Sequence, residues 1–452
     1  MTDSPQRLKV GFIMSTEVGW KTQYLNWRNG LSPETGVDPV WIPINWWKEG
    51  GLIERTPGLP SGVKARLRSQ LEIREGLDKG PFDALYVGVG HVLHGGKWFL
   101  QKQPYFITTD VTPLQLKDFG DLYGITGSRF PLYENRKHLG WVDRYKNAAG
   151  IFACSHWAAQ SLINDYGLDP WRVYVLPPGI DTNKWQFPER ELTDTLNILF
   201  VGGDFLRKGG DLLLKWAANT RFINWRMDIV TRDEVHNNDP RITVHHGLGP
   251  NDPALMELYR TANIFALPTR GDCYSLAGME GLSSGLPVIL SRTGGTGDII
   301  RDGETGYLIG PGAGDELADR LDHLLANPEE CVRMGRLGRQ DAVERFDAIT
   351  NINRTIEKIR AVLESSKQVP VPPLKATAIA AEPEKMIRVG FVMSTEVGWK
   401  TQYLNWREGL TPAMMVTPEW IVINWWDQKG VLEHIPLLPP GVKARIRSRM
   451  EL

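Results

Sequence analysis

The sequence has few cysteines, no long apolar run and almost no net charge, and each of these absences excludes a class of protein. Only three of its 452 residues are cysteine (Cys154, Cys273 and Cys331), which excludes a disulfide framework and a Cys-rich zinc site. No apolar stretch approaches the roughly 18 residues that a membrane-spanning helix needs. The net charge of −1 argues against a nucleic-acid partner, since nucleic-acid binders carry a clear basic excess.

Two further features bear on where the protein works. The first 15 residues, MTDSPQRLKVGFIMS, lack the architecture of a signal peptide. Together with the scarce cysteines, this favours a cytoplasmic protein in a reducing compartment. The basic segment 62–74, GVKARLRSQLEIR, is typical of a solvated helix whose Leu and Ile side chains pack. Peripheral contact of this segment with the inner, anionic face of a membrane is the alternative expectation.

Short β-branched runs alternate with amphipathic helical stretches along most of the chain. Strands are predicted in a first series at 8–15, 39–45, 82–89, 104–110, 150–155 and 172–181, and in a second series at 195–203, 226–231, 241–247, 263–268 and 287–291. Such alternation predicts parallel sheets built from crossover units. We therefore expect an α/β protein with two doubly wound domains, 1–190 and 191–364, facing a central cleft where ligands bind.

The chain then repeats itself. Residues 365–386 are rich in Pro, Ala and Lys and are predicted to be a linker. VGFIMSTEVGWKTQYLNWRNGL from Val10 returns as VGFVMSTEVGWKTQYLNWREGL from Val389, so that 387–452 copies 8–73 without a gap. A copy with so few strands is not expected to fold as a full domain. The sequence leaves open whether it is a remnant or belongs to a longer tandem protein.

Two carboxylates stand eight positions apart in GDCYSLAGME, just after an apolar strand. Asp272 lies in the loop after that strand, and Glu280 lies on a helix that is predicted to begin near Ser275, a good N-cap residue. The first amides of such a helix and its dipole favour phosphate, while carboxylates favour sugar hydroxyls. The spacing alone equally allows an ordinary loop Asp and an exposed helix Glu.

Two cations lie at another junction between a predicted strand and a helix, in the run FVGGDFLRKGGDLLL, residues 200–214. Arg207 and Lys208 stand where a predicted strand passes through a loop into a helix. They can neutralise a diphosphate, Arg through paired hydrogen bonds and Lys as a point charge. The alternative is a pair of solvated loop cations. Neither the G-x-G-x-x-G fingerprint nor a P-loop occurs here, which argues against a dinucleotide enzyme and a P-loop kinase.

These two segments, with RVYVLPPGIDTNKW and SRTGGTGDIIRDGETGYLI, resemble the donor domain of GT-B glycosyltransferases of the retaining family four. The resemblance extends over residues 8–364. It implies that Glu280 holds the nucleotide ribose, that Asp272 holds hydroxyls of the donor sugar, and that Lys208 contacts the diphosphate. The family usually has Glu where this chain has the shorter Asp272.

The same resemblance implies the remaining donor contacts. The family's diphosphate arginine falls at Gly203 in this sequence, a departure for which Arg207 is expected to compensate. Backbone amides at Tyr274, Ser275 and Leu276 are expected to cradle the phosphates. Gly294 and Gly295 match a glycine pair close to the donor.

On the acceptor side, MSTEVGWKTQY resembles the first loop of the family, with Gly19 in a tight turn and Lys21 opening a helix toward the cleft. The family often places a histidine after its fourth strand. His91 is the expected match, although it and His94 stand a few residues late and a loop histidine is more often structural. Asp110 ends a predicted strand at the cleft, where it either contacts the acceptor or forms an Asx-turn.

The resemblance also implies the reaction. A sugar would pass from a nucleoside diphosphate sugar to a hydroxyl acceptor of unspecified class with retention of its anomeric configuration. The diphosphate would assist acceptor deprotonation, and the chain would need no metal or other cofactor. A non-catalytic nucleotide-sugar or glycan-binding module, and an epimerase or phosphorylase of the same fold, remain as alternatives.

Overall fold

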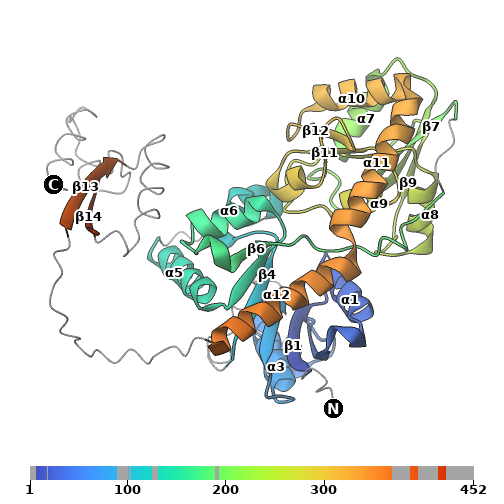
Figure 1. Cartoon of the computed structure of the whole chain (residues 1–452). Helices are drawn as coiled ribbons and strands as arrows, with labels where there is room; N and C mark the ends of the chain where they lie inside the picture. Colours follow the sequence, from blue (N-terminus) through green and yellow to red (C-terminus); the bar gives the residue numbers. More distant parts are fainter. Residues whose placement is uncertain are drawn as a thin grey trace, which may run out of the picture. The chain divides into compact units, whose positions relative to one another are not determined.

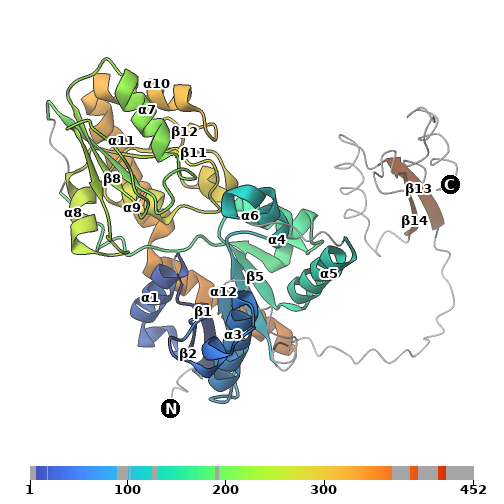
Figure 2. The ribbon, with the colours of Figure 1, turned by 180° about the vertical axis from the view of Figure 1, so that it is seen from behind.

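A computed structural model of the chain describes residues 7–17, 19–88, 100, 103–124, 131–188, 193–368, 387–394 and 416–423. The chain divides into two compact units, Met1–Pro370 and Val371–Leu452. The first unit contains two sheets, each with helices on both faces (Figures 1 and 2), and it carries the candidate site.

Six parallel strands form the N-terminal sheet, in the order β2-β1-β3-β4-β5-β6. The strands are β1 (Leu8–Ser15), β2 (Val37–Ile44), β3 (Ala84–Gly88), β4 (Tyr105–Thr109), β5 (Gly150–Ala153) and β6 (Val173–Val175). The helices are α1 (Trp20–Gly30), η1 (Pro33–Thr35), α2 (Leu52–Arg55), α3 (Ser61–Leu77), α4 (Pro113–Asp118), η3 (Gly120–Tyr123), α5 (Pro131–Asn147), α6 (His156–Asn164) and η4 (Pro170–Arg172). Chain order reverses between β1 and β3, which makes this edge of the sheet a topological switch point.

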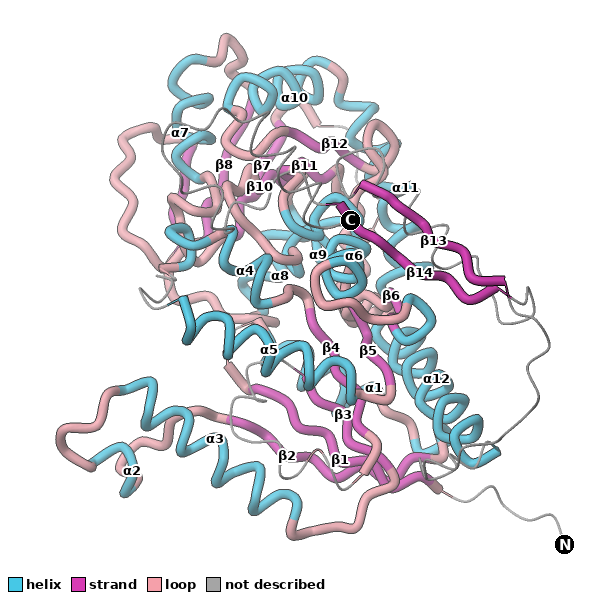
Figure 3. Tube along the Cα trace, turned by 90° about the vertical axis from the view of Figure 1, so that its left-hand side faces the viewer, coloured by secondary structure: helices cyan, strands magenta, loops and turns pink. Residues whose placement is uncertain are grey.

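Six further parallel strands form the second sheet, in the order β12-β11-β10-β7-β8-β9. They are β7 (Leu196–Val201), β8 (Trp225–Val230), β9 (Ile242–His245), β10 (Ile264–Leu267), β11 (Val288–Ser291) and β12 (Gly306–Ile309). The helices are α7 (Gly210–Asn219), α8 (Pro253–Thr261), α9 (Leu276–Ser283), η5 (Gly294–Asp298), α10 (Gly314–Ala326) and α11 (Pro328–Phe346). Figure 3 shows the strands of both sheets flanked by helices, which confirms the predicted α/β architecture.

The strands are apolar on both faces because helices cover both faces of each sheet. In β1, Val10 and Phe12 point to one face of the sheet and Ile13 points to the other, and all three are completely buried. The same holds for β10, where all four residues are buried. This double burial explains why the strands are nearly continuous apolar runs in the sequence.

The last helix of the first unit, α12 (Ala348–Gln368), returns to the N-terminal sheet (Figure 1). Its Ile352, Ile356, Ile359 and Leu363 recur at helical spacing and pack in the same cluster as residues of β1 and α1. The predicted boundary at 364 therefore follows chain order, whereas in space α12 covers the N-terminal domain. The two crossings between the domains run side by side: Ile180 donates to Phe346 O at 2.8 Å, and Ala348 donates to Ile180 O at 2.8 Å.

The second unit is described only over two strands, β13 (Ile387–Ser394) and β14 (Val416–Ile423), which pair in parallel. Ile387 faces Val416 just as Leu8 faces Val37 in the first copy, so the repeat keeps the register of β1 and β2. The predicted linker 365–386 falls mostly outside the described residues.

Two local expectations were wrong. Helix α1 begins at Trp20, one residue before Lys21, which was expected to open it. In the basic helix α3, Ile73 is buried as expected, but Leu67 and Leu71 are each 40% exposed. None of the helices in the described ranges combines the length and apolar character of a bilayer span.

Candidate functional site

Two loops meet at the carboxyl edge of the second sheet. One follows β7 and the other follows β10, and these strands are neighbours in the sheet. Parallel neighbours release their loops at the same edge. Gly209 lets the loops approach closely: its φ is +80°, and a Cβ at this position would collide with the carbonyl oxygen of Pro268.

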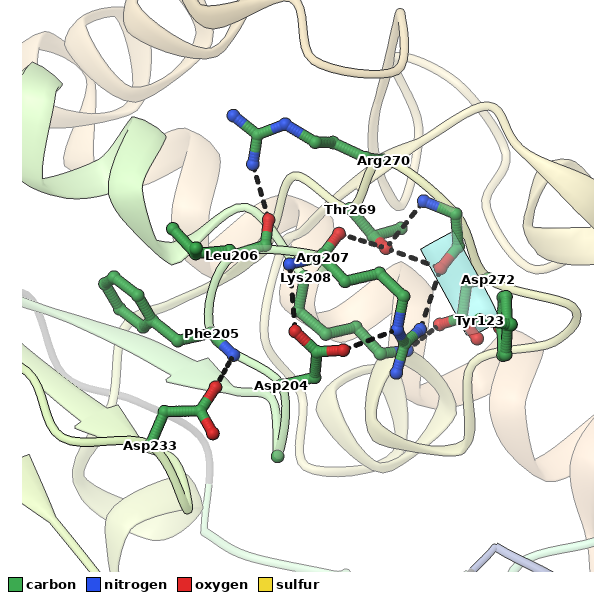
Figure 4. Close-up of polar contacts among 12 residues, drawn as sticks. Tyr123, Asp204, Phe205, Leu206, Arg207, Lys208, Asp233, Thr269, Arg270 and Asp272 are labelled. Atoms are coloured by element: carbon green, nitrogen blue, oxygen red, sulfur yellow. Dashed lines mark hydrogen bonds and ion pairs between the residues drawn. The ribbon is translucent and has the colours of Figure 1, made fainter. Parts of the chain in front are cut away.

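Hydrogen bonds join these loops along the backbone (Figure 4). Arg270 N donates to Arg207 O at 2.8 Å, and the Thr269 hydroxyl lies 3.3 Å from the same oxygen. The Thr269 hydroxyl also donates to Gly271 O at 3.1 Å. The loop after β7 is therefore held in register against the loop that carries Asp272.

Lys208 and Asp272 form an ion pair between the two loops. Lys208 Nζ lies 2.5 Å from Asp272 Oδ2, and the two side chains are only 16% and 8% exposed. In such a poorly solvated place each charge depends on the other, because leaving one unpaired would cost several kcal/mol, roughly 3–5. The predicted cation and the predicted acid are thus brought together, 64 positions apart in the chain.

Arg207 is held beside this pair. Its Nε donates to Asp204 Oδ2 at 3.0 Å, and its Nη1 donates to Gly271 O at 2.9 Å. A guanidinium has five N–H donors. These two bonds therefore leave three of its N–H groups for a further acceptor such as a phosphate oxygen.

A third cation, Arg232, lies two residues after β8 and was not among the predicted site residues. Its Nε donates to Gly203 O at 3.2 Å. A Cβ at Gly203 would approach Arg232 Nε to 2.9 Å, so the absent side chain leaves space for this guanidinium. No local pattern in the sequence pointed to Arg232, because it reaches Gly203 only through the pairing of β8 with β7 in the sheet.

Helix α9 positions the second acid. Ser275 is its N-cap, as expected, and its hydroxyl accepts from Gly278 N at 3.1 Å. Glu280 is 8% exposed, and its Oε2 accepts from Tyr259 Oη at 3.3 Å. Burial raises the pKa of Glu280 to about 7, although the Tyr259 hydrogen bond and the Lys184 charge oppose that rise. Buried carboxyl groups whose pKa is raised toward 7 are typical of functional sites.

The remaining donor-side residues close the loop around Asp272. Gly294 has φ +55°, and a Cβ there would collide with Asp272 O, so a glycine is required. Gly295 N donates to Cys273 O at 2.8 Å, and a Cβ at Gly295 would collide with the Ser155 side chain of the N-terminal domain. The glycine pair therefore packs the acidic loop against the facing domain, and Tyr274 is buried in the core of the second sheet.

At the N-terminus of α9, Leu276 is the first helical residue. The first-turn amides of a helix have no partner within the helix. The Ser275 hydroxyl satisfies the Gly278 amide, which leaves the preceding first-turn amides for an anion.

The facing domain contributes Asp110, directly after β4. Burial, with a smaller contribution from the charge of Asp272, raises the pKa of Asp110 to about 6. Gly19 has φ +91° and caps α1, consistent with the predicted tight turn, and Lys21 is exposed in the first turn. His91 and His94 lie outside the described residues.

Over the described ranges, no three His, Cys, Asp or Glu side chains are grouped so that they could hold a metal ion. All three cysteines are buried and free.

Two family models match consecutive stretches of the chain. The Glycosyltransferase Family 4 model matches residues 53–184, and the Glycosyl transferases group 1 model matches 181–341. The chain belongs to the family 4 glycosyltransferases of GT-B fold. The two matches meet close to the predicted domain boundary at 190.

Two curated relatives each align with less than half of this family 4 chain. An MMP α-(1→4)-mannosyltransferase from Mycolicibacterium hassiacum is 29% identical over 47% of this chain and 54% of its own length. A D-inositol 3-phosphate glycosyltransferase from Corynebacterium glutamicum is 32% identical over 41% of this chain and 50% of its own. The chain thus spans about half the length of the curated relatives it matches.

Solved structures share the GT-B fold at low identity. Sucrose-phosphate synthase from Thermosynechococcus elongatus aligns with a TM-score of 0.62 at 16% identity, over 80% of this chain and all of that one. HepE from Anabaena in complex with UDP-glucose aligns with a TM-score of 0.57 at 15% identity, over 78% and 100% of the two chains.

Proposed function

We propose that this family 4 chain transfers a sugar from a nucleoside diphosphate sugar to a hydroxyl acceptor, with retention of the anomeric configuration and without a metal ion. The observation that carries the proposal is the Lys208–Asp272 pair, which joins a cation loop to an acidic loop at the carboxyl edge of one sheet.

The cations of this site suit the diphosphate of the donor, and the carboxylates suit its ribose and sugar hydroxyls. The diphosphate would meet Lys208, Arg207 and Arg232 and the first-turn amides of α9. The ribose hydroxyls would donate to Glu280 and the sugar hydroxyls to Asp272. When phosphate oxygens approach Lys208, they would share its ammonium group and free Asp272 to accept from the sugar.

The reaction breaks the bond between the sugar's anomeric carbon and the diphosphate oxygen. The acceptor oxygen forms the new bond on the same face, and its proton passes to the departing diphosphate. The cations stabilise the negative charge that develops on that leaving group, as preorganised charges do in a poorly solvated site. This role of the cations supports metal independence.

The acceptor is proposed only as a hydroxyl compound. The relatives are named for different reactions, D-inositol 3-phosphate glycosylation and α-(1→4)-mannosyl transfer. The acceptor would bind on the side of the N-terminal domain, where Asp110 follows β4 and is influenced by the charge of Asp272.

The test uses purified protein with UDP-glucose first, because HepE binds it, and then with GDP-, ADP- and other UDP-sugars over a panel of hydroxyl acceptors. We expect release of a nucleoside diphosphate together with a product whose anomeric proton has the donor's configuration by NMR. Lys208→Ala is the matched inactive control. Inversion of the anomeric centre would refute the retaining mechanism. Tight binding with no turnover of any donor would instead establish a non-catalytic binding module.

A further inference from the structure

We infer that Tyr123 is a positioning residue for Arg207. Because Tyr123 belongs to the N-terminal domain, Arg207 is held in the orientation that binds the donor diphosphate only when the two domains are in contact. The inference rests on the proposed function, because it assigns Arg207 to the donor diphosphate. Tyr123 ends η3, the short turn that follows β4 and α4.

The Tyr123 ring supports Arg207 from the facing domain. The Arg207 guanidinium carbon lies 4.6 Å from the centre of the Tyr123 ring, within the range of a cation–π contact (Figure 4). The Tyr123 hydroxyl lies 3.7 Å from Cys273 Sγ, next to Asp272. One side chain of the N-terminal domain therefore touches both loops of the donor site.

The contact leaves Arg207 able to bind a ligand. Stacking uses the flat face of the guanidinium, whereas hydrogen bonds use its edge. Two of the edge donors are taken by Asp204 and Gly271 O, and the rest remain available. Tyr123 therefore fixes the plane in which Arg207 offers its N–H groups, and it does not block them.

The surroundings hold Tyr123 in this place. The Phe119 ring lies 5.7 Å from the Tyr123 ring and 5.8 Å from the Trp157 ring. Gly271 admits this turn, since a Cβ there would approach Leu122 Cδ1 to 2.8 Å. Burial, with the charge of Asp272, raises the pKa of the Tyr123 hydroxyl, so the ring stays neutral and can stack on a cation.

Because the ring and the guanidinium belong to different domains, separating the domains would release Arg207 from its stacking partner. Charge stabilisation at the leaving group would then depend on domain closure, which also brings the acceptor side into place. This coupling would disfavour donor cleavage before the acceptor domain has closed.

The test compares Tyr123→Leu and Tyr123→Met, which lack a ring, with Tyr123→Phe, which keeps it. We expect kcat for sugar transfer to fall about tenfold in the ring-free variants while the donor KM changes less than about threefold. Tyr123→Phe should stay within about twofold of the wild type. Asp121→Asn, an exposed change in the same turn, is the matched control and should leave kcat unchanged.

A double-mutant cycle separates positioning from general damage. In an Arg207→Ala background, Tyr123→Leu should have little further effect, because the group it positions is gone. An equal loss in both backgrounds would overturn the inference, as would full activity in the ring-free variants. If the wild type turns over no donor, the proposed function fails by itself. The UDP dissociation constants of the same variants then test the Tyr123–Arg207 coupling: Tyr123→Leu should weaken UDP binding more in the wild-type background than in the Arg207→Ala background, and an equal effect in both backgrounds would refute it.

Discussion

Replacing Glu280 by Gln should make the protein more stable above neutral pH and a poorer enzyme. The Glu280 carboxyl is 8% exposed, and burial raises its pKa from 4.5 to about 7. A pKa difference of this size between the unfolded and folded states corresponds to about 3 kcal/mol. The folded state therefore disfavours the ionised carboxylate, relative to the protonated acid, by this free energy.

The pH window follows from the direction of that shift. Between pH 4.5 and about 7 the folded state binds the proton more tightly than the unfolded state. The free energy of unfolding therefore falls as the pH rises through this window, and the loss is complete above it. Glu280→Gln keeps the shape and the acceptor oxygen for Tyr259 without the charge. We expect its free energy of unfolding to exceed the wild type's by up to about 3 kcal/mol at pH 8 and by little at pH 5.

Urea unfolding at pH 5 and pH 8 measures both differences, with the exposed Glu344→Gln as the matched control. In parallel, kcat/KM for the donor should fall about 10- to 100-fold, since hydrogen bonds from ribose hydroxyls to a carboxylate are stronger than those to an amide. The assignment would be refuted if Glu280→Gln had a lower free energy of unfolding than the wild type at pH 8, or exceeded the wild type by the same amount at both pH values. Either result would mean that burial does not destabilise the Glu280 carboxylate that is proposed to bind the ligand.

Two sets of substitutions and one chelation experiment also test the site. Lys208→Ala should lower kcat about 100-fold or more and destabilise the fold by about 3 kcal/mol in urea unfolding, and adding Asp272→Asn should recover part of the stability but not the activity. Gly294→Ala should cost about 2–4 kcal/mol, because its φ is +55° and its Cβ would collide with Asp272 O. Gly303→Ala, where φ is +78° with open space around it, should cost only about 1 kcal/mol, and equal losses at the two glycines would contradict the steric argument. Turnover should be unchanged by excess EDTA, and a loss that Mg²⁺ or Mn²⁺ restores would contradict metal independence.

Much of the fold could be predicted from local patterns. Doubly buried strands are continuous apolar runs, which is why β1 and β10 were predicted close to their observed bounds. The N-cap at Ser275 was visible because Ser prefers that position for its own hydrogen bond to the helix. The exposure of Leu67 and Leu71 was not predictable, because helical spacing does not show which face has a partner.

The sequence by itself determined the alternation of strands and helices, the resemblance to a GT-B donor domain, and the spacing that places Asp272 before α9 and Glu280 within it. Only the tertiary structure decided which distant groups meet. The order β10-β7-β8 brings Lys208 to Asp272 and Arg232 to Gly203, and the facing domain brings Tyr123 to Arg207. The physical reason is that local patterns report burial and hydrogen bonding within one element. Contacts between loops depend on strand order and domain packing, and these also set the burial that raises the pKa of Glu280 and Asp110.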